Sequence, residues 1–223
     1  MKHIHGAYIA TIAGIAAMSS SLIINAVYEA KGASMEGNES LSMGWAAWVL
    51  PVAAGIIISA RNFRRIISLG GKRDNFFRGS LFSYIILAAL ASLIGVIIYY
   101  AFDLPYVFDG RYGGMISVPE VFGWHLHGPL VLFLQQFAFL FLTAAFTHTF
   151  CALQGKWYGW VVNAAFIAGI CVFPAIEPLR NILAGYFYLI LFNSNALLQI
   201  VVCLALGLAF YMLNKPILAR KPI

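Results

Sequence analysis

The sequence predicts an all-helical, polytopic membrane protein, on the evidence of its composition, its charge-free runs and the placement of its charges. The 223-residue chain is 62% hydrophobic and only 10% charged, with a mean hydropathy of +0.86. Soluble domains average about 45–50% apolar and about 25% charged residues. These values exclude a soluble domain, a disordered chain, a disulfide-rich secreted module and a nucleic-acid-binding protein. We expect residues 1–223 to form a single transmembrane domain.

Charge-free runs that are long enough to cross a bilayer predict six membrane helices. A membrane helix needs about 20 apolar residues to cross about 30 Å of hydrocarbon. Pro51 falls inside the second run, which membrane helices tolerate when neighbouring groups satisfy the freed carbonyl. The predicted spans are about 7–28, 41–60, 79–102, 128–150, 157–175 and 196–214.

A short element is predicted between the fifth and sixth spans, over residues 177–193. Its apolar part, residues 181–192, has twelve residues and ends at Asn193-Ser194-Asn195. As a helix this part covers about 18 Å, which is too short to cross the hydrocarbon. We therefore expect a re-entrant or interfacial segment.

The charges orient the six predicted spans. With six crossings, eleven of the fourteen Lys and Arg residues and both termini fall on one side, whereas seven of the eight acidic residues fall on the other. The positive-inside rule makes the basic side, and thus both termini, cytoplasmic. The five tryptophans fall near predicted helix ends and are expected to form an aromatic belt at the membrane surfaces.

The segment 61–78 links the second and third spans on the basic side. We expect a loop of about twenty residues, with six basic residues among apolar ones and short helical pieces broken at Gly70-Gly71. One interpretation is an amphipathic surface held by anionic lipid headgroups. The other is a docking element for a cytoplasmic partner, with Phe anchors inside a basic rim.

The run from Ser68 to Ser80 resembles a segment of ATP-binding-cassette exporter permeases of the second type. Those permeases often carry, after their second helix, the pattern leucine–glycine–small–x–arginine–aspartate–x–phenylalanine–phenylalanine. Six spans, cytoplasmic termini and a re-entrant element before the last span extend the resemblance. The residues that match the pattern are Leu69, Gly70, Arg73, Asp74, Phe76 and Phe77.

The resemblance implies that this segment is a coupling helix that docks into a separate ATPase subunit. The chain would then be the transmembrane subunit of an ATP-driven exporter in the plasma membrane, with a second permease copy, identical or homologous, completing the path. The small bacterial members suggest an amphipathic or toxic peptide, or another hydrophobic compound, as cargo. The implied docking residues are Arg64, Arg65, Leu69, Gly70, Lys72, Arg73, Asp74, Phe76 and Phe77.

The chain lacks a nucleotide site of its own. A phosphate-binding loop requires Gly-Lys followed by Ser or Thr, but Gly71-Lys72 is followed by Arg73. We expect ATP and Mg²⁺ to bind the partner ATPase, no cofactor to bind this chain, and no enzymatic activity in the chain itself. No Asp, Glu, Lys or Arg lies inside a predicted span, which argues against ion-coupled transport.

Polar residues near or inside the spans give further candidates. Asn25, Gln135, Gln136 and Asn163 could line a translocation path, and hydrogen bonding between helices explains them equally well. The re-entrant segment is predicted to form an outer gate, with Glu177, Arg180 and Tyr186 as its residues. The i, i+3 spacing of Glu177 and Arg180 also suits an ion pair.

Small residues four apart predict close helix packing, as at Ala165/Gly169 and Cys203/Gly207. His125 and His127 are separated from His148 by about 30 Å of helix and cannot share a metal ion. We expect structural or interfacial histidines and buried, inert thiols.

Two alternatives remain open at this point. A substrate-capture subunit of a vitamin importer fits the length and the small-residue spacing. A membrane enzyme or haem-binding subunit would need a polar site inside the membrane, which the sequence does not provide.

Overall fold

The computed structural model describes residues 40–42, 44–105, 115–154, 157–172 and 176–219. The predicted first span, 7–28, and with it Asn25, lie outside the described residues.

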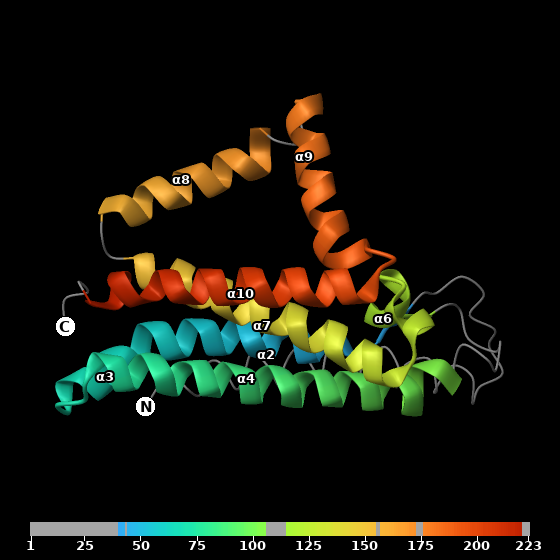
Figure 1. The fold of residues 1–223 in the computed structure, drawn as a ribbon, viewed down its shortest axis with the longest axis horizontal. Coiled ribbons are helices and arrows are strands. Elements are labelled where there is room, and N and C mark those ends of the chain that lie inside the picture. The colour runs from blue at the N-terminus through green and yellow to red at the C-terminus, as the bar shows by residue number, and fades with distance from the viewer. Residues whose placement is uncertain (1–39, 43, 106–114, 155–156, 173–175, 220–223) are drawn as a thin grey trace, which may run out of the picture.

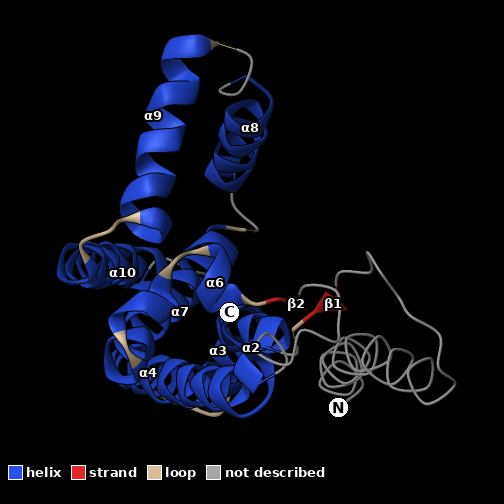
Figure 2. Cartoon of the chain, turned by 90° about the vertical axis from the view of Figure 1, so that its right-hand side faces the viewer, coloured by secondary structure: helices blue, strands red, loops and turns tan. Residues whose placement is uncertain are grey.

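The described chain is built almost entirely from helices, which confirms the all-helical class (Figures 1 and 2). Two strands of two residues each, β1 (Ser40–Leu41) and β2 (Met115–Ile116), form a parallel pair. The helical elements are α2 (Gly44–Ile57), the π-helical turn η1 (Ile58–Asn62), α3 (Phe63–Ser68), α4 (Arg73–Ile98), the π-helical turn η2 (Tyr99–Asp103), α6 (Val118–Val121), the 3₁₀ turn η3 (Trp124–His127), α7 (Pro129–Leu153), α8 (Trp157–Val172), α9 (Glu177–Phe187), the π-helical turn η4 (Tyr188–Phe192) and α10 (Ala196–Ala219).

Four of the described helices are long and apolar enough to cross a membrane, which indicates a membrane protein. They run over Gly44–Ser68, Arg73–Asp103, Pro129–Leu153 and Ala196–Leu218. A helix of 25 residues, such as the first of these, is about 37 Å long and exceeds the roughly 30 Å of hydrocarbon. The four helices overlap the predicted spans 41–60, 79–102, 128–150 and 196–214.

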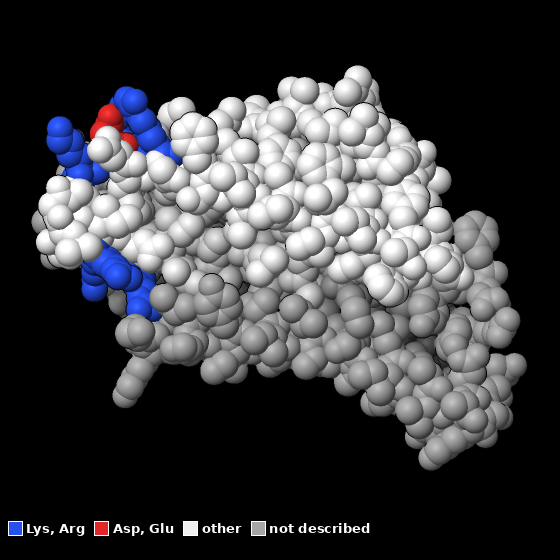
Figure 3. Space-filling model, turned by 90° about the horizontal axis from the view of Figure 1, so that it is seen from below, with Lys and Arg blue, Asp and Glu red and all other residues white. Residues whose placement is uncertain are grey.

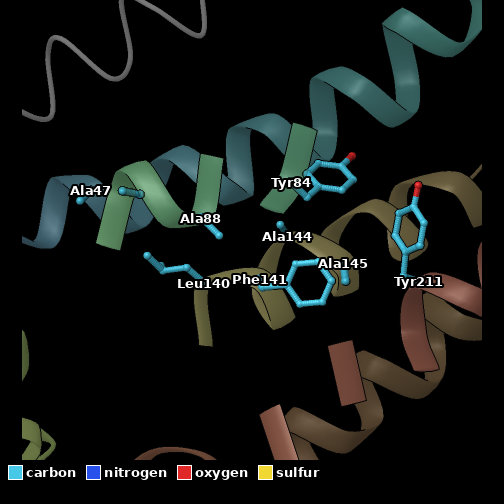
Figure 4. Close-up of a cluster of buried hydrophobic side chains, with 9 residues drawn as sticks. Ala47, Tyr84, Ala88, Leu140, Phe141, Ala144, Ala145 and Tyr211 are labelled. Atoms are coloured by element: carbon cyan, nitrogen blue, oxygen red, sulfur yellow. The ribbon is translucent and has the colours of Figure 1, made fainter. Parts of the chain in front are cut away.

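These four helices form a bundle in which α7 occupies the centre. α7 packs against α2, α4 and α10, and the helices lie side by side along the long axis of the molecule (Figure 1). Small side chains at the crossings allow the backbones to approach closely. Figure 4 shows this core, in which Ala47, Ala88, Ala144 and Ala145 lie in one cluster with larger side chains such as Phe141.

The helices α8 and α9 form an arm that stands away from the bundle (Figures 1 and 2). α8 has 16 residues and covers about 24 Å, and residues 173–175 of the predicted span 157–175 lie outside the described residues. α9 runs across the direction of the bundle helices and has no buried residue. With η4 it makes one helical stretch over residues 177–192, followed by the predicted break before α10.

The expected helical pieces broken at Gly70-Gly71 are found, but the expected loop of about twenty residues over 61–78 is not. Helical structure continues from α2 through η1 and α3 to Ser68, and α4 begins at Arg73. Only four residues, Leu69–Lys72, join the two helices. The prediction failed because charged side chains mark the end of the hydrocarbon and not the end of the helix, which continues past it into water.

The predicted aromatic belt is found only in part. Trp124 is fully buried, and its indole N–H donates to the Leu191 carbonyl over 2.8 Å. Trp48 stacks on Trp124 with ring centroids 5.9 Å apart. Trp160, on the arm, is 79% exposed and is the kind of residue that a belt contains. A buried indole is stable here because its N–H finds an internal acceptor.

Candidate docking surface at the basic end

Basic side chains gather at one end of the described molecule, where α3 meets α4 and where α10 ends (Figure 3). Among the described residues, Asp74 is the one acidic residue at this end, and Arg180 on α9 is the one basic residue elsewhere. Asp103 and Glu120 lie toward the opposite end. The basic residues of this end are Arg61, Arg64, Arg65, Lys72, Arg73, Arg78 and Lys215.

The turn between α3 and α4 depends on two glycines. The N–H of Gly70 donates to the Ile67 carbonyl over 3.0 Å, and the N–H of Gly71 donates to the Ile66 carbonyl over 2.9 Å. Gly70 has φ = 84°, a left-handed conformation that side chains disfavour. A Cβ on Gly71 would lie 2.8 Å from the Ile66 carbonyl oxygen, so only glycine fits. These contacts fold the chain back within four residues.

The apex of this turn presents an apolar side chain within a basic rim. Leu69 is 78% exposed, and Arg64, Arg65 and Lys72 around it are exposed as well. An exposed leucine with exposed cations close to it in the sequence suits a partner that offers an apolar pocket bordered by acidic groups. Gly70 and Asp74 are also exposed. Six of the nine predicted docking residues therefore face solvent; we call these residues the tip.

The two phenylalanines of the motif do not face outward as docking anchors. Phe76 is 5% exposed, and its ring meets that of Phe63 edge-on with centroids 5.3 Å apart. Phe77 packs against Tyr211 with centroids 4.7 Å apart. Both rings therefore fasten the start of α4 to the bundle, and the large apolar side chain of the motif that is exposed is Leu69.

The two charged residues of the motif, Arg73 and Asp74, differ in their contacts. Arg73 donates from Nη1 to the Leu218 carbonyl over 2.9 Å, which ties the start of α4 to the end of α10. Asp74 forms an exposed i, i+4 ion pair with Arg78 at 3.4 Å. Such a pair contributes little stability in water.

Beneath the tip, buried polar side chains link α4, α7 and α10. The Tyr84 hydroxyl is hydrogen-bonded to Nδ1 of His148 over 2.5 Å. The Tyr211 hydroxyl lies 2.6 Å from the Ser80 hydroxyl and donates to the Phe77 carbonyl. His148 is thus a buried structural histidine, as its sequence context predicts, and it joins two helices of the bundle.

The predicted path residues of α7 lie inside the bundle. Gln135 is fully buried and donates from Nε2 to Oε1 of Gln199 over 2.6 Å. Gln199 in turn donates to the Ile190 carbonyl over 3.0 Å. Gln136 is 2% exposed and packs against Gly95. Hydrogen bonding between helices, one of the two explanations open at the sequence level, is thus present, and a path role stays a prediction.

The other sequence candidates lie on or near the arm. Asn163 on α8 forms two hydrogen bonds with Gln154, of 3.0 and 3.1 Å. Glu177, Arg180 and Tyr186 are exposed on α9, and within the described part of the chain no ion pair joins Glu177 to Arg180. That expected ion pair is absent because an exposed pair gains too little to fix two flexible side chains.

The histidines that precede α7 contact backbone carbonyls. His125 Nδ1 lies 3.1 Å from the Pro119 carbonyl oxygen, and His127 Nε2 lies 3.1 Å from that of Ser194. Among the residues that the structure describes, no three His, Cys, Asp or Glu side chains come together to hold a metal ion. A structural role for both histidines agrees with these contacts.

Sequence reasoning missed Asp103. It follows the predicted span 79–102 directly, yet it is only 2% exposed and accepts a hydrogen bond from the Ser42 hydroxyl over 2.5 Å. The helical structure continues through η2 to this residue. No sequence signal joins Ser42 to an aspartate 61 positions away, because the contact exists only after the chain folds.

Comparisons of the chain with protein-family models, with curated proteins and with solved structures find no match.

Proposed function

We propose that this chain is the transmembrane subunit of an ATP-driven exporter of the ATP-binding-cassette type, and that its tip docks a separate ATPase. The exposed, basic tip with Leu69 at its apex carries the proposal. The plasma membrane is the proposed location, with the basic end in the cytoplasm. ATP and Mg²⁺ would bind to the partner, and the cargo would be an amphipathic peptide or another hydrophobic compound.

The composition of the tip supports docking to a protein. Protein contacts are strongest where an apolar anchor enters a pocket inside a charged rim. Leu69 is 78% exposed at the end of a helical hairpin, where it cannot be covered by its own bundle. The rim charges Arg64, Arg65 and Lys72 would steer an acidic partner surface toward it.

The way in which the tip is attached supports a mechanical role. The helical stretches Gly44–Ser68 and Arg73–Asp103 meet there and extend through the whole bundle. Phe76 and Arg73 fix the start of α4 to the bundle and to the end of α10. A displacement of the tip would therefore be passed to three long helices as rigid bodies.

A second permease copy is part of the proposal because the arm leaves packing surface uncovered. On α8, Ala165 is exposed, and a Cβ added at Gly169 would meet nothing within 4 Å. Small residues at this spacing allow close approach of another helix. A second copy, identical or homologous, would supply one.

A pair of matched substitutions tests the docking role. Leu69→Asp places a carboxylate at the apex, and Leu126→Asp makes the same change at a residue that is 77% exposed at the other end. Both side chains are largely uncovered by the rest of the protein, so neither change disturbs the core. The detergent-solubilised protein is isolated from its native host, and co-purifying proteins are identified by mass spectrometry.

We expect an ATPase with a phosphate-binding loop to co-purify with the unaltered chain and with Leu126→Asp, and to be lost with Leu69→Asp. Equal recovery of the ATPase with both variants would assign docking to another surface. Absence of any ATPase from the unaltered chain in several mild detergents would contradict the proposal.

A further inference from the structure

A groove separates α3 from the start of α4, beside the tip. It has a volume of about 370 Å³, within the range of about 300–1,000 Å³ that is usual for small-molecule sites. Its wall combines amide, ammonium and apolar groups and contains no acidic residue. The lining residues that matter here are Asn62, Ile66, Lys72, Asn75, Phe76 and Gly79.

The polar end of the groove suits a phosphate. Lys72 is exposed and forms no ion pair with any described acidic residue. The first backbone hydrogen bond at the start of α4 runs from the N–H of Phe76 to the Lys72 carbonyl, so the N–H groups of Asp74 and Asn75 have no acceptor within the helix. They stand at the positive end of a 26-residue helix. The amides of Asn62 and Asn75 add further donors.

The groove continues into an apolar stripe along α4. Asn75, Gly79 and Ser83 follow one another at i, i+4 spacing and line the groove. The same face goes on to Ile86 and Leu90, which are 58% and 54% exposed. Along this face the helix therefore changes from polar donors to exposed apolar side chains within about three turns, which is the order of groups in a phospholipid.

We propose that the groove between α3 and α4 binds the phosphate of an anionic membrane phospholipid, whose acyl chains extend along the stripe of α4. Charge complementarity selects this occupant, because six basic residues and one acidic residue lie between residues 61 and 78. The position agrees, since the groove lies where the basic end gives way to apolar surface. The inference goes beyond the docking of an ATPase and needs no second protein.

The test compares three exposed positions. Lys72→Gln removes the ammonium group from the groove. Gly79→Leu fills the groove without changing the net charge, and nothing in the protein lies within 4 Å of the Cβ that it adds. Arg78→Gln is the control, because it removes the same charge from a residue that is exposed and does not line the groove. Each protein is placed in vesicles of equal phosphatidylglycerol and phosphatidylcholine, and retained lipid is measured by native mass spectrometry.

We expect the unaltered chain and Arg78→Gln to retain phosphatidylglycerol in preference to phosphatidylcholine. Lys72→Gln should lower that preference about fivefold, the usual effect of one unpaired basic group at a membrane surface, whereas the charge of Arg78 is already paired with that of Asp74. Gly79→Leu should lower the preference because its side chain occupies the groove. Unchanged retention in both variants, or an equal fall in all three, would overturn the proposal. Displacement of the lipid by millimolar inorganic phosphate would also overturn it, because the groove would then bind a soluble anion.

Discussion

The bundle and the arm are both apolar, yet they pack very differently. Half of the most apolar stretch of α7 is buried, whereas α9 has no buried residue. In the bundle, Gly207 of α10 meets the ring of Phe141, and a Cβ there would lie 2.8 Å from it. On the arm, nothing approaches Gly169 or Gly185 within 4 Å of such an atom.

This difference shows that a small residue allows two helices to pack closely but does not by itself cause them to do so. Both Ala165/Gly169 and Cys203/Gly207 have the same four-residue spacing, and only the second pair is covered by a neighbouring helix. Buried polar groups accompany the covered pair, as with Gln135 and Gln199. Where lipid is as apolar as a side chain, shape and hydrogen bonds decide which helices associate.

The largest expected contrast comes from two glycine substitutions. Gly207→Leu forces a side chain into Phe141 and the backbone of Leu142, and overpacking of this kind costs about 1–3 kcal/mol. Gly185→Leu places the same side chain in open space on α9, so stability should change by less than about 0.5 kcal/mol. Thermal unfolding in detergent measures both. Equal losses would mean that the arm is packed as tightly as the bundle.

A smaller effect is expected from the buried amides of the bundle. Gln199→Leu removes the acceptor of Gln135 and a donor to the Ile190 carbonyl, which should lower stability by about 1–2 kcal/mol. Replacing Gln135 by Leu as well removes the stranded group and should restore part of that loss. A double-mutant cycle in the same unfolding assay checks this, and strictly additive losses would show that the two amides do not interact.

The smallest effect is expected at the amide pair that joins α7 to the arm. Asn163→Leu breaks two hydrogen bonds to Gln154, but both side chains are only partly buried. Water or the lipid headgroups can replace the lost partner, so we expect a change of about 0.5 kcal/mol. A loss as large as that of Gln199→Leu would place the arm in the same cooperative unit as the bundle.

Composition was enough to predict the helical class. Charge-free runs were enough to locate four of the long helices, because the thickness of the bilayer sets the length of a helix that crosses it. The break at Gly70-Gly71 was predicted, but the short length of the connection was not, since Arg61, Arg64 and Arg65 interrupt the apolar run without interrupting the helix. At the tip, the sequence correctly grouped the basic residues, but it could not tell that Phe76 turns inward to Phe63 while Leu69 turns outward. Those directions depend on contacts between distant helices.

Site-specific photocrosslinking at the apex of the tip tests the central claim most directly. Leu69→p-benzoylphenylalanine places a reactive group at the predicted docking contact in living cells, and the same replacement of Leu126 serves as the control at the other end. We expect position 69 alone to give a crosslinked product that mass spectrometry identifies as an ATPase with a phosphate-binding loop. If position 69 reacts only with lipid, or with a protein that has no such loop, the tip is not an ATPase docking surface.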